Sequence, residues 1–251
     1  MTPAVVRYGP EPDQFAQLWQ PARPATPPAV VVLVHGGYWR HRYRCDLMEP
    51  LAADLCARGY AVWNLEYRRT GGPGGGWPGT FDDVAAGLDA LASVPGLDAG
   101  PPAIVGHSAG GQLALWACAR RRVDRFRPAR VVPGFAVSLA GVCDLTEAAR
   151  QRLSDGAVIE LLGGTPDERP DRYRAACPTL LLPLGVPQLV VHGTDDVHVP
   201  FPFGPRYAAA ASAAGDACEL VVLPGVDHFA LVDPASAAWA TVAGHLDRWR
   251  W

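Results

Sequence analysis

Gly106-His107-Ser108-Ala109-Gly110 follows a short apolar run, Ala103-Ile104-Val105, and precedes residues of helical type from Gly111 onward. The apolar run is typical of the end of a buried strand, so these five residues predict a sharp turn from a strand into a helix. Side chains at the two flanking glycines would clash with the neighbouring strand and helix. A serine at such a turn projects its hydroxyl at the end of the sheet, where the helix N-terminus favours negative charge. The alternative is a glycine-rich turn in which Ser108 only caps the helix.

The composition favours one folded α/β protein and excludes several kinds of chemistry. The 251 residues are 49% hydrophobic and 19% charged, which is typical of a globular chain. The net charge of −3 gives no electrostatic basis for binding nucleic acid or an anionic membrane. All 22 basic residues are arginine, which excludes Schiff-base lysine chemistry, a Ser-Lys dyad and a lysine-dependent phosphate loop.

The cysteines and the hydropathy pattern favour a cytoplasmic protein without a cofactor. The N-terminus lacks a basic segment followed by an apolar run, so no signal peptide is expected. No apolar run approaches ~20 residues, so no membrane span is expected. The six cysteines form no C-x-x-C pair, which favours free thiols. No metal is expected either, because His192, Asp195 and His198 match no standard zinc spacing.

Apolar runs that alternate with helical patterns predict a mostly parallel, doubly wound sheet with helices on both faces. Strands are expected at 4–8, 29–34, 60–67, 103–105, 131–140, 186–191 and 218–223. Helices are expected at 46–58, 80–91, 205–214 and 235–249, and another begins at 111. In such sheets ligands bind beyond the carboxyl ends of the strands.

One domain, residues 1–251, is expected, with an insertion rather than a second domain. Near the N-terminus Pro21, Pro24, Pro27 and Pro28 favour an extended approach to the core. Residues 146–183 break the alternation of strands and helices. An insertion at this point follows a strand of the sheet, so it is expected to lie over the carboxyl edge as a partial lid.

His35-Gly36-Gly37-Tyr38-Trp39 comes directly after the valine-rich run. Two glycines at this point let the backbone approach a ligand with its N–H groups free, which is what an oxyanion hole requires. The alternative is a plain turn with aromatic side chains packed beneath it.

A serine nucleophile needs a base, and the base needs a carboxylate that fixes its tautomer. His228 is the best candidate for the base because it follows the last expected strand among small turn residues. Asp195 and Asp196 both precede it, and the residues alone leave the choice of acid open. The order Ser108, acid, His228 is the one found on α/β-hydrolase sheets.

With these segments in place, the chain resembles the α/β-hydrolase superfamily over nearly its whole length. Residues 35–39 together with 106–110 are similar to hormone-sensitive-lipase-like esterases and to serine-type arylformamidases (kynurenine formamidases). The superfamily carries its acid in a G-x-x-D-x-x-V-P run, and here Gly193-Thr194-Asp195-Asp196-Val197-His198-Val199-Pro200 selects Asp196. The resemblance also implies that backbone N–H groups of Gly36, Gly37 and Ala109 bind the oxyanion.

Two departures favour the arylformamidase-like group. Glu66-Tyr67-Arg68 stands where the esterases carry Asp-Tyr-Arg, but a glycine-rich loop follows instead of Leu-Ala-Pro-Glu. The long N-terminal cap helices of the lipase-like esterases are also missing.

The sequence therefore predicts a serine hydrolase for a small-molecule acyl substrate: an aryl formamide such as N-formylkynurenine, or a short-chain carboxylic ester. The expected aromatic walls of the pocket are Tyr38, Trp39, Trp77 and Phe229, with core packing as an alternative role for Trp77. Two other hypotheses stay open at this stage: an oligopeptidase-type peptidase and a non-catalytic small-molecule binder on the same fold.

Overall fold

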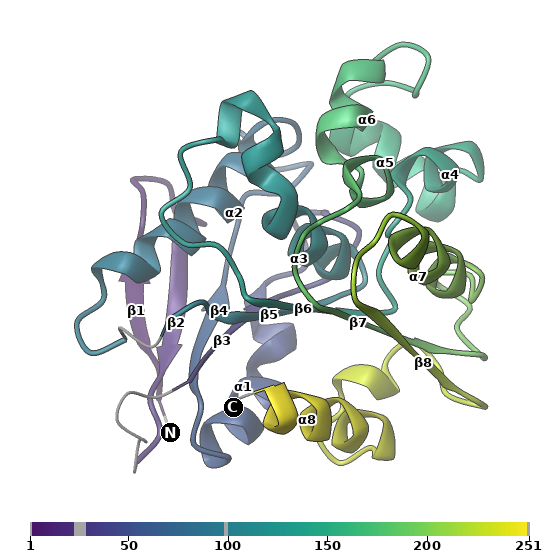
Figure 1. Ribbon diagram of the computed structural model, residues 1–251. Coiled ribbons are helices and arrows are strands. Elements are labelled where there is room, and N and C mark those ends of the chain that lie inside the picture. Colours follow the sequence, from purple (N-terminus) through teal and green to yellow (C-terminus); the bar gives the residue numbers. More distant parts are fainter. Residues whose placement is uncertain (1, 23–28, 98–99, 250–251) are drawn as a thin grey trace.

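The computed structural model describes residues 2–22, 29–97 and 100–249. These residues form one eight-stranded sheet with helices packed against it (Figure 1). Its strands are β1 Ala4–Arg7, β2 Phe15–Trp19, β3 Val30–Val34, β4 Ala61–Leu65, β5 Ala103–His107, β6 Phe135–Leu139, β7 Gln188–Gly193 and β8 Cys218–Leu223. Their order across the sheet is β1-β2-β4-β3-β5-β6-β7-β8. The pairs β1–β2 and β2–β4 are antiparallel, and the other neighbours are parallel. The prediction of a mostly parallel sheet is thus confirmed.

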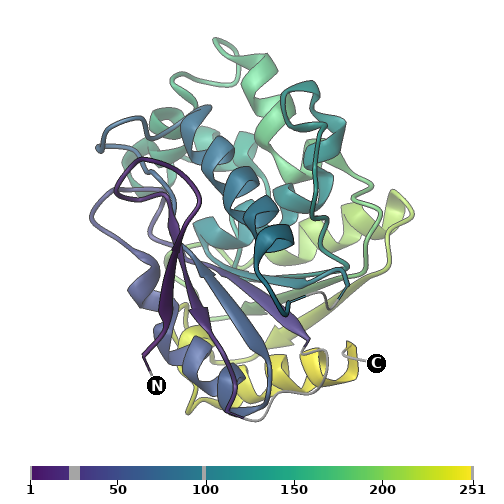
Figure 2. The same cartoon turned by 90° about the vertical axis from the view of Figure 1, so that its left-hand side faces the viewer.

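Helices lie on both faces of this sheet (Figures 1 and 2). They are α1 Glu49–Ala57, α2 Gly79–Ala90, α3 Ala109–Ala119, α4 Leu145–Arg150, α5 Leu153–Leu162, α6 Pro170–Ala176, α7 Phe203–Ala213 and α8 Ala237–Trp249. Successive side chains of a strand point to opposite faces, so Val32 and Val34 pack in one core with residues of α2, α3 and α7. Val31 and Leu33 pack in a second core with residues of α1 and α8. The apolar run of β3 is therefore buried on both sides.

Three segments differ from the sequence prediction. β2 was not expected, and it pairs with β4 near the edge of the sheet. The expected helix at 46–58 begins as a short 3₁₀ turn, Cys45–Met48, and becomes α1 where Pro50 sits in the first turn, a position that needs no N–H. β6 is shorter than expected because Pro133 and Gly134 precede it. Of the predicted extended approach, Pro21 lies outside any helix or strand just after β2, and Pro24, Pro27 and Pro28 lie outside the described residues.

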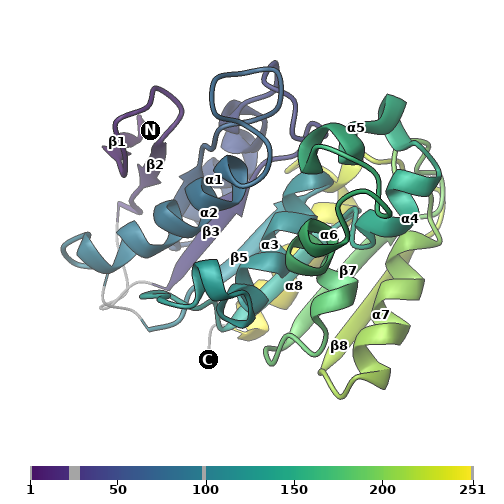
Figure 3. The same cartoon turned by 90° about the horizontal axis from the view of Figure 1, so that it is seen from above.

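The insertion after β6 supplies α4, α5 and α6, which Figure 3 shows beside and above α3. Two side chains of α3 hold it: Gln112 donates to the carbonyl oxygen of Ala176 and Trp116 to that of Ala175, each at 2.9 Å. Because α3 begins at the serine turn, these bonds tie the insertion to the element behind Ser108. Its function as a lid stays a prediction.

Candidate active site

Ser108 joins β5 to α3 with a left-handed backbone, φ 57° and ψ −120°. A Cβ atom at Gly106 would lie 2.0 Å from the carbonyl oxygen of Gly110. A Cβ atom at Gly110 would lie 2.0 Å from the carbonyl oxygen of Val34 on the neighbouring strand. Both distances are far shorter than any van der Waals contact, so only glycine fits at either position and the predicted steric reason for the motif is confirmed.

A pocket of about 280 Å³ opens at the carboxyl ends of the strands beside this turn. It is lined by Gly37, Tyr38, Arg42, Tyr43, Leu47, Met48, His107, Ser108, Ser154, His198, His228, Phe229 and Val232. Ser108 and His228, which are far apart in the sequence, thus meet in one cavity. Tyr38 and Phe229, two of the four expected aromatic contacts, also line it.

His228 is paired with Asp196. Its Nδ1–H donates to Oδ2 of Asp196 at 2.6 Å. Asp195 is exposed instead, and its carboxylate accepts the hydroxyl of Thr194 at 2.9 Å. Of the two candidate acids, Asp196 is therefore the one that contacts the imidazole.

The carboxylate of Asp196 is held as an anion by its surroundings. Its Oδ1 accepts the backbone N–H groups of His198 and Val199, each at 2.8 Å. Burial acts to raise the pKa of Asp196, but hydrogen bonds from His192 and His228 outweigh burial and hold that pKa well below its ordinary value. A permanent negative charge therefore faces Nδ1 of His228.

The second ring nitrogen of His228, Nε2, has no hydrogen-bond partner in the described part of the chain. The Ser108 hydroxyl is likewise not hydrogen-bonded to it, although both residues line the same pocket. Catalytic hydrogen bonds of this kind often tighten only in the complex with substrate. The imidazole is thus oriented at one nitrogen and available at the other.

His107 supports the loop that carries His228, a contact that the sequence analysis missed. Its Nε2 lies 3.0 Å from the carbonyl oxygen of His228, and the two ring centroids are 4.4 Å apart. Burial and the charge of His228 lower the pKa of His107 to about 3. His107 is therefore neutral near pH 7, and its Nε2–H donates to the carbonyl oxygen.

The predicted oxyanion residues lie close to the serine. A Cβ atom at Gly36 would be 3.0 Å from Cβ of Ser108. None of the amide N–H groups of Gly36, Gly37 and Ala109 donates to another residue of the described chain. The carbonyl oxygen of Gly36 accepts Nδ1–H of His35 at 2.8 Å, and in a trans peptide the N–H of Gly37 points the opposite way.

His35 itself belongs to a fully buried pair. Its Nε2 lies 2.9 Å from Oε1 of Glu66. Because one ring nitrogen faces a carbonyl oxygen and the other a carboxylate oxygen, both nitrogens are placed to donate. Burial acts to raise the pKa of Glu66, but the charges of His35 and Arg69 and the hydrogen bond from His35 lower it to about 2.

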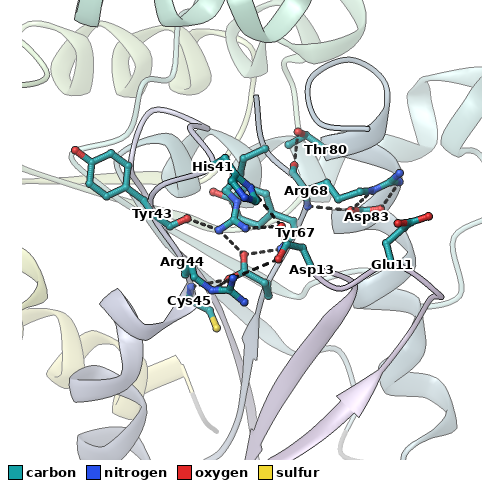
Figure 4. A network of polar contacts seen from close by, with 12 residues as sticks. Glu11, Asp13, His41, Tyr43, Arg44, Cys45, Tyr67, Arg68, Thr80 and Asp83 are labelled. Atoms are coloured by element: carbon teal, nitrogen blue, oxygen red, sulfur yellow. Dashed lines mark hydrogen bonds and ion pairs between the residues drawn. The ribbon is translucent and has the colours of Figure 1, made fainter. Parts of the chain in front are cut away.

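The same carboxylate anchors a wider charged network (Figure 4). Nη1 of Arg69 lies 2.9 Å from Oε1 of Glu66, and its Nη2 donates to Asp13 at 2.7 Å. The backbone N–H of Cys45 donates to Oε2 of Glu66 at 3.0 Å. These contacts hold the segment after β3 against the end of β4.

The prediction that Trp39 and Trp77 line the pocket is wrong. Trp39 is fully buried, and its Nε1–H donates to Gln112 at 3.1 Å. The positive φ angles of Tyr38 and Trp39 (51° and 56°) mark the turn at which the indole enters the core. The ring centroids of Trp77 and Phe81 lie 5.1 Å apart, and Trp77 packs against the hydrophobic core. Its alternative role in core packing is therefore the correct one.

The described residues offer no metal site and no membrane-spanning helix. They contain no group of three or more His, Cys, Asp or Glu side chains placed to hold a metal ion. Within the same ranges, every helix is too short or too polar to cross a bilayer. All six cysteines are free thiols.

Comparison with known proteins gives a family and two curated relatives. A family model described as BD-FAE matches residues 17–204. The chain is 28% identical over 246 residues to "Esterase LipC" of Mycobacterium tuberculosis, covering 92% of this chain and 60% of that protein. It is 26% identical to "Probable isoprenylcysteine alpha-carbonyl methylesterase ICME" of Oryza sativa subsp. japonica, covering 89% and 57%. The chain thus spans about three fifths of the length of these relatives.

Solved structures match almost the whole chain. The esterase Est2 of Thermogutta terrifontis, with propionate bound, superposes with a TM-score of 0.79 at 22% identity, covering 99% of this chain and 93% of that one. Esterase B of Lactobacillus rhamnosis superposes with a TM-score of 0.81 at 21% identity, covering 100% and 85%. At these identities the similarity shows the fold, and the predicted α/β-hydrolase fold is confirmed.

Proposed function

This chain belongs to the BD-FAE family, and from that premise we propose that it is a serine hydrolase of the carboxylesterase type. The observation that carries the proposal is the state of His228. One ring nitrogen is bonded to Asp196, whereas the other has no partner in the described chain, and the ring lines the same pocket as Ser108. A histidine in this state can take a proton at Nε2 while the carboxylate stabilises the resulting charge.

The proposed reaction has two halves. Oγ of Ser108 attacks the carbonyl carbon of the ester while Nε2 of His228 takes the hydroxyl proton. The carbonyl oxygen becomes an oxyanion and accepts N–H groups of Gly36, Gly37 and Ala109. His228 returns the proton to the departing alkoxide, which leaves as an alcohol. The acyl group stays bonded to Ser108 as an acyl-enzyme. Water then attacks the acyl-enzyme by the same steps, which releases the carboxylic acid and restores Ser108.

An ester is the first substrate class that we propose. The curated relatives are named as esterases, and a cavity of about 280 Å³ suits a small acyl group and a compact leaving group. An aryl formamide such as N-formylkynurenine is the second candidate, because its carbonyl would meet the same serine and amides. Its support is the resemblance of residues 35–39 to serine-type arylformamidases, together with the glycine-rich loop after Arg68. None of the relatives named above is a formamidase.

The pocket walls are part of the same proposal. The hydroxyl of Tyr38 donates to the carbonyl oxygen of His198 at 2.5 Å, which ties the tyrosine to the loop that carries Asp196. Phe229 is 59% exposed, and its ring centroid lies 5.3 Å from that of His228. We also propose that residues 146–183 limit access to the pocket, since Ser154 lines it. The free cysteines support a cytoplasmic location.

The test compares 4-nitrophenyl acetate and butyrate with N-formylkynurenine in parallel assays of the wild type and Ser108→Ala. The wild type should hydrolyse the esters, and the variant should lose about 10⁴-fold or more in kcat/KM while its melting temperature stays unchanged. Equal rates in both proteins would overturn the proposal. Turnover of the formamide at a higher kcat/KM than either ester would make it the preferred substrate. Cleavage of peptides alone would favour the peptidase, and an absence of any turnover would favour the non-catalytic binder.

A further inference from the structure

One charged side chain of the pocket, Arg42, has no counterion among the described residues. Arg42 lines the cavity together with Ser108 and His228. The arginines nearest to it in the sequence are paired: Arg40 lies 3.9 Å from Glu160, and Arg44 lies 3.6 Å from Asp13. Arg42 forms no ion pair and no hydrogen bond with any residue of the described chain.

The backbone on both sides of Arg42 is held by hydrogen bonds. The N–H of His41 donates to the carbonyl oxygen of Thr70 at 2.9 Å, and the N–H of Tyr43 donates to that of Arg40 at 3.1 Å. The carbonyl oxygen of Tyr43 accepts a hydrogen bond from Arg69. Figure 4 shows the Tyr43 ring turned away from the charged network that its carbonyl oxygen joins.

The Tyr43 ring, in turn, places the Arg42 charge. Cζ of Arg42 lies 4.8 Å from the centroid of this ring, a cation–π distance. Tyr43 also packs on the oxyanion segment, because a Cβ atom at Gly37 would lie 2.4 Å from its Cβ atom. The cation is therefore attached through one rigid ring to the residues beside Ser108.

No opposite charge lines the cavity. None of its described lining residues is an aspartate or a glutamate, and the carboxylate of Asp196 behind His228 is already paired. The remaining wall is largely apolar, with Leu47, Met48, Phe229 and Val232. The whole chain carries a net charge of −3, so its overall charge gives no general attraction for anions.

We propose that Arg42 makes the pocket selective for esters that carry a carboxylate on an apolar acyl or leaving group, an inference that rests on the proposed esterase activity. The guanidinium binds the carboxylate, and the apolar wall receives the hydrocarbon or aromatic part between that charge and the reacting carbonyl. Arg42 is exposed, so the attraction is screened by salt.

Two matched pairs of esters test this inference and locate the charge. The first pair, 4-acetoxybenzoate and its methyl ester, differs in charge on the leaving group. The second pair, mono-4-nitrophenyl adipate and its methyl ester, differs in charge on the acyl group. The readout is the ratio of kcat/KM for the charged ester to that for the neutral ester, measured in the wild type, Arg42→Gln, Arg42→Lys and Arg127→Gln. Arg127 is the control because it is an exposed arginine outside the pocket lining.

We expect Arg42→Gln to lower this ratio about tenfold in at least one pair, because the lost cation acts on the charged ester and not on the neutral one. Arg42→Lys should keep most of the ratio and Arg127→Gln should leave it unchanged. Adding 0.5 M NaCl should reduce the ratio in the wild type, Arg42→Lys and Arg127→Gln, which all keep a cation at position 42, and should change it little in Arg42→Gln. An unchanged ratio in both pairs, with neutral esters still hydrolysed, overturns the inference and leaves the esterase proposal intact. Failure of the wild type to hydrolyse any of the four esters overturns both.

Discussion

Two histidine–carboxylate pairs lie at the carboxyl ends of the strands, and they differ in what the second ring nitrogen meets. His228 bonds to Asp196 through Nδ1 at 2.6 Å, and its Nε2 has no partner in the described residues. His35 bonds to Glu66 through Nε2 at 2.9 Å, and its Nδ1 donates to the carbonyl oxygen of Gly36. His228 of the first pair lines a pocket, whereas both residues of the second pair are completely enclosed.

This difference separates two uses of the same pair of residue types. A histidine with one free nitrogen can accept and return a proton, which general base catalysis requires. A histidine whose two nitrogens both donate cannot accept a proton, but it can hold a peptide in one orientation. We therefore expect His228 to act in the chemistry, and His35 to act by positioning the Gly36–Gly37 peptide.

Asp196→Asn should have the largest effect on activity, because it removes the charge that fixes the His228 tautomer and changes the shape little. We expect kcat/KM for a nitrophenyl ester to fall about 10⁴-fold. Asp195→Asn is the matched control, and its exposed carboxylate should matter by less than about twofold. Steady-state kinetics of the two variants decide between the acids, and an equal loss in both would contradict the assignment.

Glu66→Gln should change stability more than chemistry. It leaves the buried charges of His35 and Arg69 facing a neutral amide, so the free energy of unfolding should fall by about 3–5 kcal/mol. Movement of the Gly36–Gly37 peptide should lower kcat/KM by about 10²-fold at most. Urea denaturation and ester kinetics measure the two effects.

The control for Glu66→Gln is Asp82→Asn, which breaks an exposed pair with Arg125 at 2.6 Å. That variant should lose less than about 1 kcal/mol. If the buried and the exposed substitutions cost the same, the Glu66 pair does not hold the segment after β3.

His107→Gln should produce the smallest effect, one that depends on pH. Because the pKa of His107 in the folded protein is about 3, below its ordinary value, the unfolded chain binds more protons between pH 3 and 6.5. The wild type should therefore lose about 2 kcal/mol of unfolding free energy through this residue between pH 7 and pH 5. The variant keeps a donor for the His228 carbonyl and should lose less over the same range. Urea denaturation at several pH values measures the unfolding free energy of both proteins. If it falls by the same amount in the wild type and in His107→Gln between pH 7 and pH 5, the prediction is contradicted.

The sequence was sufficient for the parts of the site that follow from local sterics and strand order. Gly106 and Gly110 could be assigned because a backbone turn that tight excludes side chains whatever surrounds it. Asp196 and His228 could be brought together because both follow parallel strands, whose carboxyl ends lie at one edge. The choice between the two acids still needed the resemblance to a known superfamily.

The remaining parts depend on tertiary contacts that no local pattern contains. β2 forms because β4 offers it an antiparallel partner, although prolines follow it closely in the sequence. Trp39 lies two residues after Gly37, beside the serine turn, yet a left-handed turn directs it into the core. The supporting contacts of His35 and His107 come from distant segments, so their residue types alone gave no indication of them.

The most direct test of the central claim is the site and rate of covalent labelling by a fluorophosphonate, followed by mass spectrometry of the intact protein and of its peptides. The account predicts one adduct per chain, located on Ser108, absent in Ser108→Ala and formed at least about 10³-fold more slowly in His228→Ala. An adduct on another residue, or labelling of His228→Ala at the wild-type rate, would contradict it.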